Sequence, residues 1–191
     1  MSVSTLPLLV LVLSLFSCTQ EKPVSLFMAN HQDSWITDGP GDWTFKDDEM
    51  IMISDSGSSF IMTRQMYQNF ELQVEFFPDS TVNSGVFIHC QNRELSAATC
   101  YEFNIWDLHP NQDFRTGAVV TRAKPLKMVE TLNQWNTYRI RVENGKLAAW
   151  INEIKTVDLE NAELNEGYIA LQAAGQGTVK FRNAHLRELQ P

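Results

Sequence analysis

Hydrophobic and polar residues alternate strictly in several short segments of the chain. From Phe70 to Phe76 every second side chain is apolar and the side chains between them are polar. Tyr138–Val142 repeats this pattern, and Asn144-Gly145 separates it from the largely apolar run Leu147–Ile151. A period of two residues is typical of a strand with one buried face, and Asn-Gly between two such runs is typical of a tight β-hairpin. These segments predict antiparallel strands.

Further short runs with the same character continue almost to the end of the chain. The predicted strands are Trp43–Phe45, Met50–Ser54, Phe60–Thr63, Gly85–Cys90, Tyr101–Trp106, Ala118–Thr121, Tyr168–Gln172 and Val179–Phe181. Helical periodicity is scarce, with Leu159–Leu164 at most a turn. About ten short strands with polar turns predict an all-β fold of two packed antiparallel sheets, a sandwich or jelly roll.

The first residues differ from this pattern. Met1–Ser17 contains no charged side chain, and Leu6–Phe16 is almost entirely apolar, but the run is short for a membrane span and ends at Cys18. Leu15–Cys18 resembles the site at which bacterial lipoproteins are cleaved and acylated on cysteine. An ordinary signal peptide or a buried N-terminal segment is the alternative.

We therefore expect a lipoprotein signal at residues 1–17, lipidation of Cys18, a tether at 18–25 and one domain at 26–190. The protein would be an exported lipoprotein of the bacterial cell envelope, in the periplasm or at the outer membrane. The lipid would be its only contact with the membrane.

The balance of charged residues argues against some classes of binding partner. Fifteen Lys and Arg against 23 Asp and Glu give a net charge of -8, which argues against nucleic acid. After cleavage, Cys90 and Cys100 would be the only thiols besides Cys18. Export would favour a disulfide between them, and two separate buried thiols are the alternative.

Two strands predicted to be neighbours carry polar residues that could form a site. The first strand places Glu102, Asn104 and Trp106 on the side opposite Tyr101, Phe103 and Ile105. The second places Gly85, Phe87 and His89 on the side opposite Val86, Ile88 and Cys90. If these strands pair, one apolar face forms only when the two apolar sets match.

This register predicts His89 beside Glu102 and Asn104, with Phe87 and Trp106 as aromatic walls. In this register Cys100 faces the wrong side for a simple cross-strand disulfide with Cys90, so any bridge would need a bent strand end. A carboxylate, an amide, an imidazole and an indole on one face are typical of a sugar site. The alternative is an ordinary solvated strand face.

Five segments in order resemble the 3-keto-disaccharide hydrolase domain family, from about Leu26 to Leu189. They are Asn83–Ile88, Tyr101–Asp107, Thr116–Ala118, Gln134–Tyr138 and Gly167–Gln172 with Val179–Asn183. The resemblance implies a concanavalin A-like jelly roll, export from bacteria, and cleavage of 3-keto-glycosides by hydrolysis or by elimination and hydration. The substrate would be an oligosaccharide or another glycoside.

Matching positions imply cleft roles for five residues: Glu102, Asn104, Asp107, Thr116 and Gly117. The chain departs from the family at His89, where Arg is common, at Asn104, where Gln is common, and at Val119-Val120, which replaces an apolar-Tyr pair. These departures bear on substrate detail and on activity itself. A non-catalytic carbohydrate-binding module on the same fold is the alternative function.

Cleavage next to a ketone at C3 needs a base for the acidic C2 hydrogen, a stabiliser for the enolate oxygen and an acid for the departing oxygen. We expect Glu102 or His89 as the base, Asn104 or a divalent cation as the stabiliser, and Asp107 or His109 as the acid. Burial beside aromatic residues would raise the pKa of Glu102.

No cofactor is certain, but a divalent metal ion could be held by His89, Glu102, Asp107 and His109. Thr116-Gly117 would serve first as a turn, and Lys124 could lie on a loop at the cleft rim. Other polar or aromatic residues are assigned no role in the site: His31 and His185 at the surface, Trp135 and Trp150 in sheet packing, and Asp47–Glu49 in a solvated turn with calcium binding as the alternative.

Overall fold

A computed structural model describes residues 22–27, 35–46, 49–54 and 57–190 of the chain. Its elements are β1 (Val24–Ser25), β2 (Trp35–Asp38), β3 (Asp42–Lys46), β4 (Glu49–Ser54), β5 (Ser58–Thr63), β6 (Phe70–Pro78), β7 (Val82–Cys90), β8 (Tyr101–Ile105), the 3-10 helix η2 (Gln112–Phe114), β9 (Asn136–Glu143), β10 (Lys146–Ile151), β11 (Ile154–Glu160), β12 (Tyr168–Gly175) and β13 (Gly177–Glu188). No helix among these residues is long and apolar enough to cross a membrane. The predicted signal segment and lipidated Cys18 lie outside the described residues.

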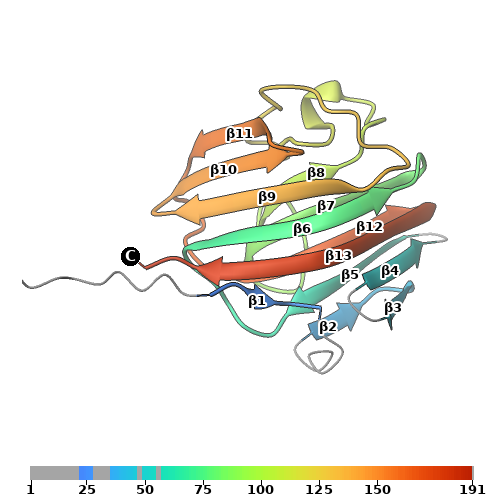
Figure 1. Cartoon of the computed structure of the whole chain (residues 1–191), viewed down its shortest axis with the longest axis horizontal. Coiled ribbons are helices and arrows are strands. Elements are labelled where there is room, and N and C mark those ends of the chain that lie inside the picture. The colour runs from blue at the N-terminus through green and yellow to red at the C-terminus, as the bar shows by residue number, and fades with distance from the viewer. Residues whose placement is uncertain (1–21, 28–34, 47–48, 55–56, 191) are drawn as a thin grey trace, which may run out of the picture.

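The strands form two antiparallel sheets. The larger sheet has the order β11-β10-β9-β6-β13-β4-β3, with β1 also paired to β13, and the smaller sheet has the order β2-β5-β12-β7-β8. Figure 1 shows β9, β6 and β13 in front of the smaller sheet, and the long connection between β8 and β9 looping over one end. The predicted all-β fold of two packed sheets is confirmed.

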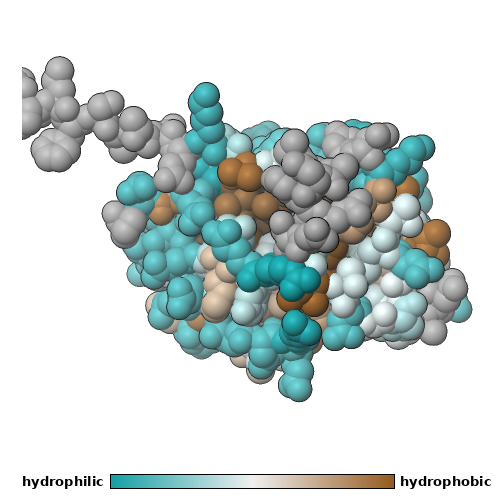
Figure 2. All heavy atoms as spheres, turned by 90° about the horizontal axis from the view of Figure 1, so that it is seen from below, coloured by the Kyte–Doolittle hydropathy of each residue, from teal (hydrophilic) through white to brown (hydrophobic). Residues whose placement is uncertain are grey.

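The core lies between the sheets. The apolar members of the alternating run on β6, from Phe70 to Phe76, are at most 2% exposed. They belong to one cluster with Val86 and Ile88 of β7 and with Tyr101 and Phe103 of β8. Seen from below, the surface is largely hydrophilic, and hydrophobic residues show there only in patches (Figure 2). Burial of one face of each sheet therefore holds the two layers together.

Tight turns explain the strand order at one edge of the larger sheet. Asn144 and Gly145 have φ angles of 50° and 75°, as the predicted Asn-Gly hairpin between β9 and β10 requires. Asn152 and Glu153, with φ angles of 49° and 65°, make a second hairpin into β11. The sequence pattern missed β11 because its pairing with β10 shifts after Ala149, which interrupts the alternation.

Two other predictions about elements are wrong in detail. Val24 and Ser25, placed in the tether, pair with β13 as β1, and β2 was not predicted. The expected strand Ala118–Thr121 contributes only isolated bridges at Val119. Leu159–Leu164, where at most a turn was expected, contains the end of β11 and no helix.

The pairing of β7 with β8 follows the predicted register up to Ile88. Val86 pairs with Phe103 and Ile88 with Tyr101, so the apolar sets match as expected. At His89 the backbone turns into the left-handed region, with φ at 52°, and the register against β12 shifts at the same point. Such a bulge adds one residue and inverts the alternation beyond it.

The bulge overturns the prediction that His89 lies beside Glu102. The imidazole points into the core, where its ring centroid is 5.9 Å from that of Phe70 and 6.0 Å from that of Tyr101. Its Nδ1 is 2.8 Å from the Leu164 carbonyl oxygen and its Nε2 is 2.9 Å from that of Gln68. Burial lowers the pKa of this histidine, and it is 2% exposed. His89 is therefore a core residue.

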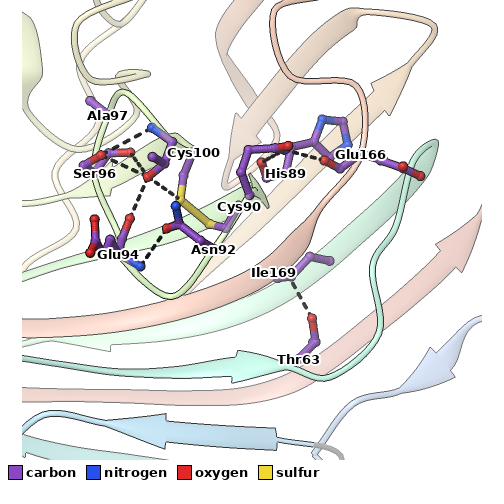
Figure 3. Close-up of a disulfide and its surroundings, with 12 residues drawn as sticks. Thr63, His89, Cys90, Asn92, Glu94, Ser96, Ala97, Cys100, Glu166 and Ile169 are labelled. Atoms are coloured by element: carbon purple, nitrogen blue, oxygen red, sulfur yellow. Dashed lines mark hydrogen bonds between the residues drawn. A yellow bond between two sulfur atoms is a disulfide. The ribbon is translucent and has the colours of Figure 1, made fainter.

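The same inversion allows the disulfide. Cys90 now faces Cys100, and the two are bonded with their Cα atoms 4.3 Å apart (Figure 3). The expectation that a bridge needs a bent strand end is met by the bulge at His89, and the disulfide alternative is confirmed. Arg122 Nη1 donates to the Cys100 carbonyl at 3.2 Å and also to that of Ala97, which ties down the loop that the disulfide closes.

Replacing His89 by Ala should destabilise the fold rather than act on chemistry alone. The change removes both ring contacts with buried carbonyl groups and leaves a cavity, so we expect the free energy of unfolding to fall by about 3 kcal/mol. Urea denaturation followed by circular dichroism would measure it. The control is His185→Ala, since His185 is exposed, with an expected change below about 0.5 kcal/mol. Equal stabilities for the two variants would contradict the core assignment.

Candidate functional site

The candidate site lies on the face of the smaller sheet that points away from the larger one, which we call the outer face. Strand pairing sets its side chains in two rows across β5, β12, β7 and β8. One row is Phe60, Gln172, Gly85 and Asn104, and the other is Met62, Ala170, Phe87 and Glu102. The predicted placement of Glu102 and Asn104 on one face, with Phe87 beside Glu102, is therefore observed.

Apolar side chains cover much of this face. Phe60, Met62, Phe87 and Ala170 form a second buried cluster with the disulfide, and Leu95 of the disulfide loop packs against it. On the far side of β8, the Val120 amide donates to the Glu102 carbonyl at 3.0 Å, and Phe103 is bridged to Val119. Val120 thus extends the second row beyond Glu102, which stands between two apolar neighbours, Phe87 and Val120.

These apolar surroundings change the pKa of the Glu102 carboxyl group. Burial raises its pKa from 4.5 to about 7, because the low-dielectric surroundings disfavour the charged form. Among the described residues no side chain forms a hydrogen bond or ion pair with this carboxyl. A carboxyl group with a pKa near neutrality can accept or release a proton at physiological pH.

Gly85 packs closely against Phe87 and Glu102 on this face. A Cβ atom built on Gly85 would lie 3.6 Å from Glu102 Cγ and 3.2 Å from Phe87 Cε2. A larger side chain at this position would therefore press on the Phe87 ring and on the Glu102 side chain.

Gln172 is a polar residue of this face that the sequence analysis did not select. It pairs with Gly85, its Nε2 donates to Ser58 Oγ at 3.1 Å, and its buried Oε1 has no partner. The signal was present in the sequence, since the alternation of β12 places Tyr168, Ala170 and Gln172 on one side.

Asn104 lies at its predicted position, but both ends of its side-chain amide form hydrogen bonds within the protein. Its Nδ2 donates to the Phe114 carbonyl, and its Oδ1 accepts from the Ile105 amide at 3.0 Å. The side chain is 2% exposed. Asn104 therefore holds the connection around η2 against β8, and nothing observed supports its predicted role as enolate stabiliser.

Asp107 is likewise structural. Its two oxygens accept from the Thr131 amide at 2.7 Å and from Thr131 Oγ1 at 2.9 Å, and Arg115 lies 3.7 Å away. Asp107 is 3% exposed, and these three contacts fix its side chain inside the protein. The geometry does not support its predicted role as an acid.

His109 and Trp106 lie together just beyond β8. Their ring centroids are 4.5 Å apart in an edge-on arrangement, and His109 also contacts Phe114 at 5.8 Å. His109 Nδ1 is 2.8 Å from the Asn111 carbonyl oxygen. Both rings are half-buried and Trp106 follows Asn104 on the chain, so substrate contact by these two residues stays a prediction.

Three further residues were predicted to contact a ligand: Thr116, Gly117 and Lys124. Gly117 has a φ of 88°, as its turn role requires, and a Cβ there would lie 3.0 Å from Thr156 Cβ of β11. Thr116 is fully buried and its hydroxyl oxygen has no partner, while Lys124 is exposed. Thr116 and Gly117 thus pack inside the fold, against the prediction of direct ligand contact.

The four predicted metal ligands do not converge. His89 is in the core and Asp107 is bound by Thr131 and Arg115, whereas Glu102 and His109 stand apart from both. Within the described parts of the chain, no three His, Cys, Asp or Glu side chains are arranged to hold a metal ion. The prediction of a site built from these four residues is wrong.

A hollow of about 510 Å³ lies on the larger sheet, lined by Pro23, Glu71, Gln73, His185 and Arg187. Its charged groups satisfy one another: Glu71 pairs with Arg187 at 3.2 Å, with Arg141 at 3.5 Å and with Arg139 at 3.7 Å. An already paired carboxylate is poorly suited to proton transfer. The outer face of the smaller sheet is therefore the better candidate.

Comparison with known families agrees with the fold. The sequence matches the 3-keto-alpha-glucoside-1,2-lyase-like domain family over residues 22–187. The chain belongs to this family. No curated protein matches the chain.

Solved structures similar to this family member share its fold at low sequence identity. A proposed glycosyl hydrolase of Parabacteroides distasonis is 22% identical, with a TM-score of 0.76 over 88% of this chain and 100% of that one. The carbohydrate-binding module CBM66 of Bacillus subtilis is 16% identical, with a TM-score of 0.64 over 81% and 96%. A Bacillus subtilis protein of galectin-like fold is 11% identical, with a TM-score of 0.61 over 88% and 97%. The predicted jelly roll is thereby confirmed.

The raised pKa of Glu102 predicts a pH-dependent effect of Glu102→Gln on stability. Folding favours the protonated form, so the wild type loses stability as the pH rises from about 4.5 to about 7, and the variant does not. We expect the free energy of unfolding of the variant, relative to wild type, to rise by about 2–3 kcal/mol between pH 4 and pH 8. Urea denaturation at both pH values measures this difference.

The matched control is Glu94→Gln, because Glu94 is an exposed residue of the disulfide loop. Its relative stability should stay within about 0.5 kcal/mol at both pH values. A Glu102→Gln variant whose advantage does not grow with pH would show that Glu102 is ordinarily solvated.

Proposed function

We propose that the protein cleaves 3-keto-glycosides by removing the hydrogen at C2 of the oxidised sugar, with Glu102 as the base. The observation that carries this proposal is the carboxyl group of Glu102. It has a pKa of about 7, no protein partner among the described residues, and a side chain that runs beside Gly85 rather than against a larger residue. Membership of the 3-keto-alpha-glucoside-1,2-lyase-like family supplies the substrate class.

The chemistry follows from the ketone. A carbonyl group at C3 makes the hydrogen on C2 acidic, because the electrons left behind form an enolate. The enolate then expels the oxygen substituent from C1, forming a double bond between C1 and C2, and the departing oxygen takes a proton from water. Addition of water to this product would complete a net hydrolysis. The protein must supply a base at C2 and a donor at the enolate oxygen.

The half-buried position of Glu102 suits the base role. A carboxylate with an ordinary pKa near 4.5 would be a weak base toward a carbon acid, and a pKa near 7 strengthens it while leaving much of it ionised at neutral pH. Substrate binding would also remove water from the same apolar surroundings. The site thus needs no second carboxylate beside Glu102 for the first step.

A carbohydrate-binding module without catalysis is the second candidate. Neither His89 nor Asp107 accompanies Glu102, so the predicted acid-base pair is absent from the outer face. The fold is also shared with a carbohydrate-binding module. On this alternative, Glu102 and the aromatic residues beyond β8 would bind sugar hydroxyls and ring faces.

We further propose that the domain is exported and held at the bacterial cell envelope by a lipid on Cys18. The support is the sequence of residues 1–18 alone. Incorporation of radiolabelled palmitate into the full-length protein, and its loss in Cys18→Ala, would test the anchor.

The decisive assay compares 3-keto-glucosides with their unoxidised parents. We expect the wild type to release the aglycone only from the keto substrates, and Glu102→Gln to lose at least about 100-fold in kcat/KM while remaining folded. Glu94→Gln is the control and should keep wild-type activity. Binding of both sugar forms without release of aglycone would instead favour the binding module.

The pH profile of the same reaction gives a separate test. Because the base must be ionised, kcat/KM should rise with pH and level off above a midpoint near 7. A midpoint near 4.5, the ordinary value for a glutamate, would exclude Glu102 as the base.

A further inference from the structure

Arg122 connects three parts of the chain beside β8. Its Nη1 donates to the Cys100 carbonyl at 3.2 Å and to that of Ala97, both in the loop that the disulfide closes. Its Nε and Nη2 donate to Glu163 Oε2 at 3.3 Å and 3.2 Å, in the connection before β12. Its guanidinium carbon lies 4.7 Å from the ring centroid of Tyr101 on β8. The side chain is 12% exposed, so these contacts are largely shielded from water.

The backbone of Arg122 belongs to a tight turn that carries Val120. Val119 and Ala123 exchange two backbone hydrogen bonds of 2.8 Å, so residues 120–122 form the turn between them. Thr121 in this turn has a φ of 66°, a conformation that is unfavourable for residues other than glycine. Such a turn persists only when contacts outside it hold it in place, and the Arg122 side chain supplies contacts of this kind.

The two segments that Arg122 joins lie on opposite sides of Glu102. On one side is Val120, whose amide donates to the Glu102 carbonyl at 3.0 Å. On the other side is Phe87 of β7, which belongs to the buried cluster that Leu95 of the disulfide loop packs against. Neither neighbour is charged, and burial is the cause of the raised pKa of Glu102. The contacts of Arg122 thus act on both apolar walls around this carboxyl group.

We propose that Arg122 is a positioning residue that holds the Val120 turn and the disulfide loop against the two sides of Glu102 and so limits the access of water to its carboxyl group. This inference rests on the proposed role of Glu102 as the base. Arg122 acts through these walls and not by its charge, since its guanidinium is paired with Glu163.

The variant Arg122→Met removes the hydrogen bonds and the charge but keeps an unbranched side chain. We expect the pKa of Glu102 to fall from about 7 by at least about 1 pH unit, toward 4.5, because water then reaches the carboxyl group. Loss of a cation that acted on Glu102 by its charge would instead raise this pKa. A ¹³C NMR titration of protein labelled at its glutamate carboxyl carbons measures it, with Glu102→Gln identifying the signal.

Arg139→Met is the matched control. Arg139 lies on the larger sheet, with its guanidinium carbon 3.9 Å from the ring centroid of Trp150 and its Nη1 3.7 Å from Glu71 Oε2, so this variant loses similar contacts. The pKa of Glu102 should stay within about 0.3 of its wild-type value. A fall below about 1 pH unit in Arg122→Met, or an equal fall in Arg139→Met, would overturn the role of Arg122.

Turnover of a 3-keto-glucoside gives a second readout. The midpoint of kcat/KM against pH should fall in Arg122→Met by the same amount as the pKa of Glu102. The plateau above it should be about threefold lower, because a weaker base removes the C2 proton more slowly. Should Arg122→Met fail to fold, Arg122→Lys keeps the charge but cannot span the carbonyl groups and Glu163 together, so both values should fall by at least about 0.5 pH unit. A smaller fall would overturn the proposal.

The titration also separates this inference from the proposed function. A wild type whose Glu102 titrates near 4.5 overturns both the proposed base and the role of Arg122. A wild type whose Glu102 titrates near 7, but which releases no aglycone, overturns the proposed function alone. The titration of Arg122→Met then still decides whether Arg122 holds the surroundings of Glu102.

Discussion

The left-handed backbone of His89 decides what each face of the smaller sheet carries. One extra residue at this point of β7 sends the imidazole between the sheets and brings Cys90 out toward Cys100. The imidazole there lies within hydrogen-bonding distance of two backbone carbonyl oxygens, from Gln68 and Leu164, which belong to connections on different sides of the strand. The bulge thus fixes both the core and the loop beside the site, and with them the surroundings of Glu102.

As a consequence, the immediate neighbours of Glu102 are apolar and not charged. In place of an imidazole next to the carboxyl group, Glu102 has Phe87 on one side and Val120 on the other. The apolar neighbours raise its pKa by burial alone, whereas a cationic neighbour would have lowered it. The protein therefore gives up stability at neutral pH to keep this group reactive, which is a common feature of active sites.

The sequence predicted those parts of the fold that depend on alternation. The register of Val86 and Ile88 against Phe103 and Tyr101 followed from the need for one apolar face, and the Asn144-Gly145 hairpin followed from its turn residues. The position of Glu102 on the outer face came from the same argument.

The predictions that failed at His89 and in β11 assumed that the period of two continued without a bulge. A bulge at His89 and another between β10 and β11 leave no clear mark in the sequence, since His and Ala-Trp are ordinary strand residues. The roles of Asn104 and Asp107 could not be separated from those of Glu102 either. Their partners Phe114 and Thr131 lie in the long connection between β8 and β9, whose path the alternation pattern does not predict. Gln172 was missed because it lies on a strand distant in sequence from β8.

The long connection between β8 and β9 links these observations. Asp107, Arg115 and Thr131 form a buried polar network that joins its beginning, middle and end, and Asn104 fixes η2 to the sheet. Because the segment is held at these points, residues 116–120 lie beside β8 almost as a further strand, and Val120 shields Glu102. Asn104 and Asp107, which were predicted to take part in the reaction, thus act indirectly. They hold the segment that contains Val120, and burial by this segment raises the pKa of Glu102.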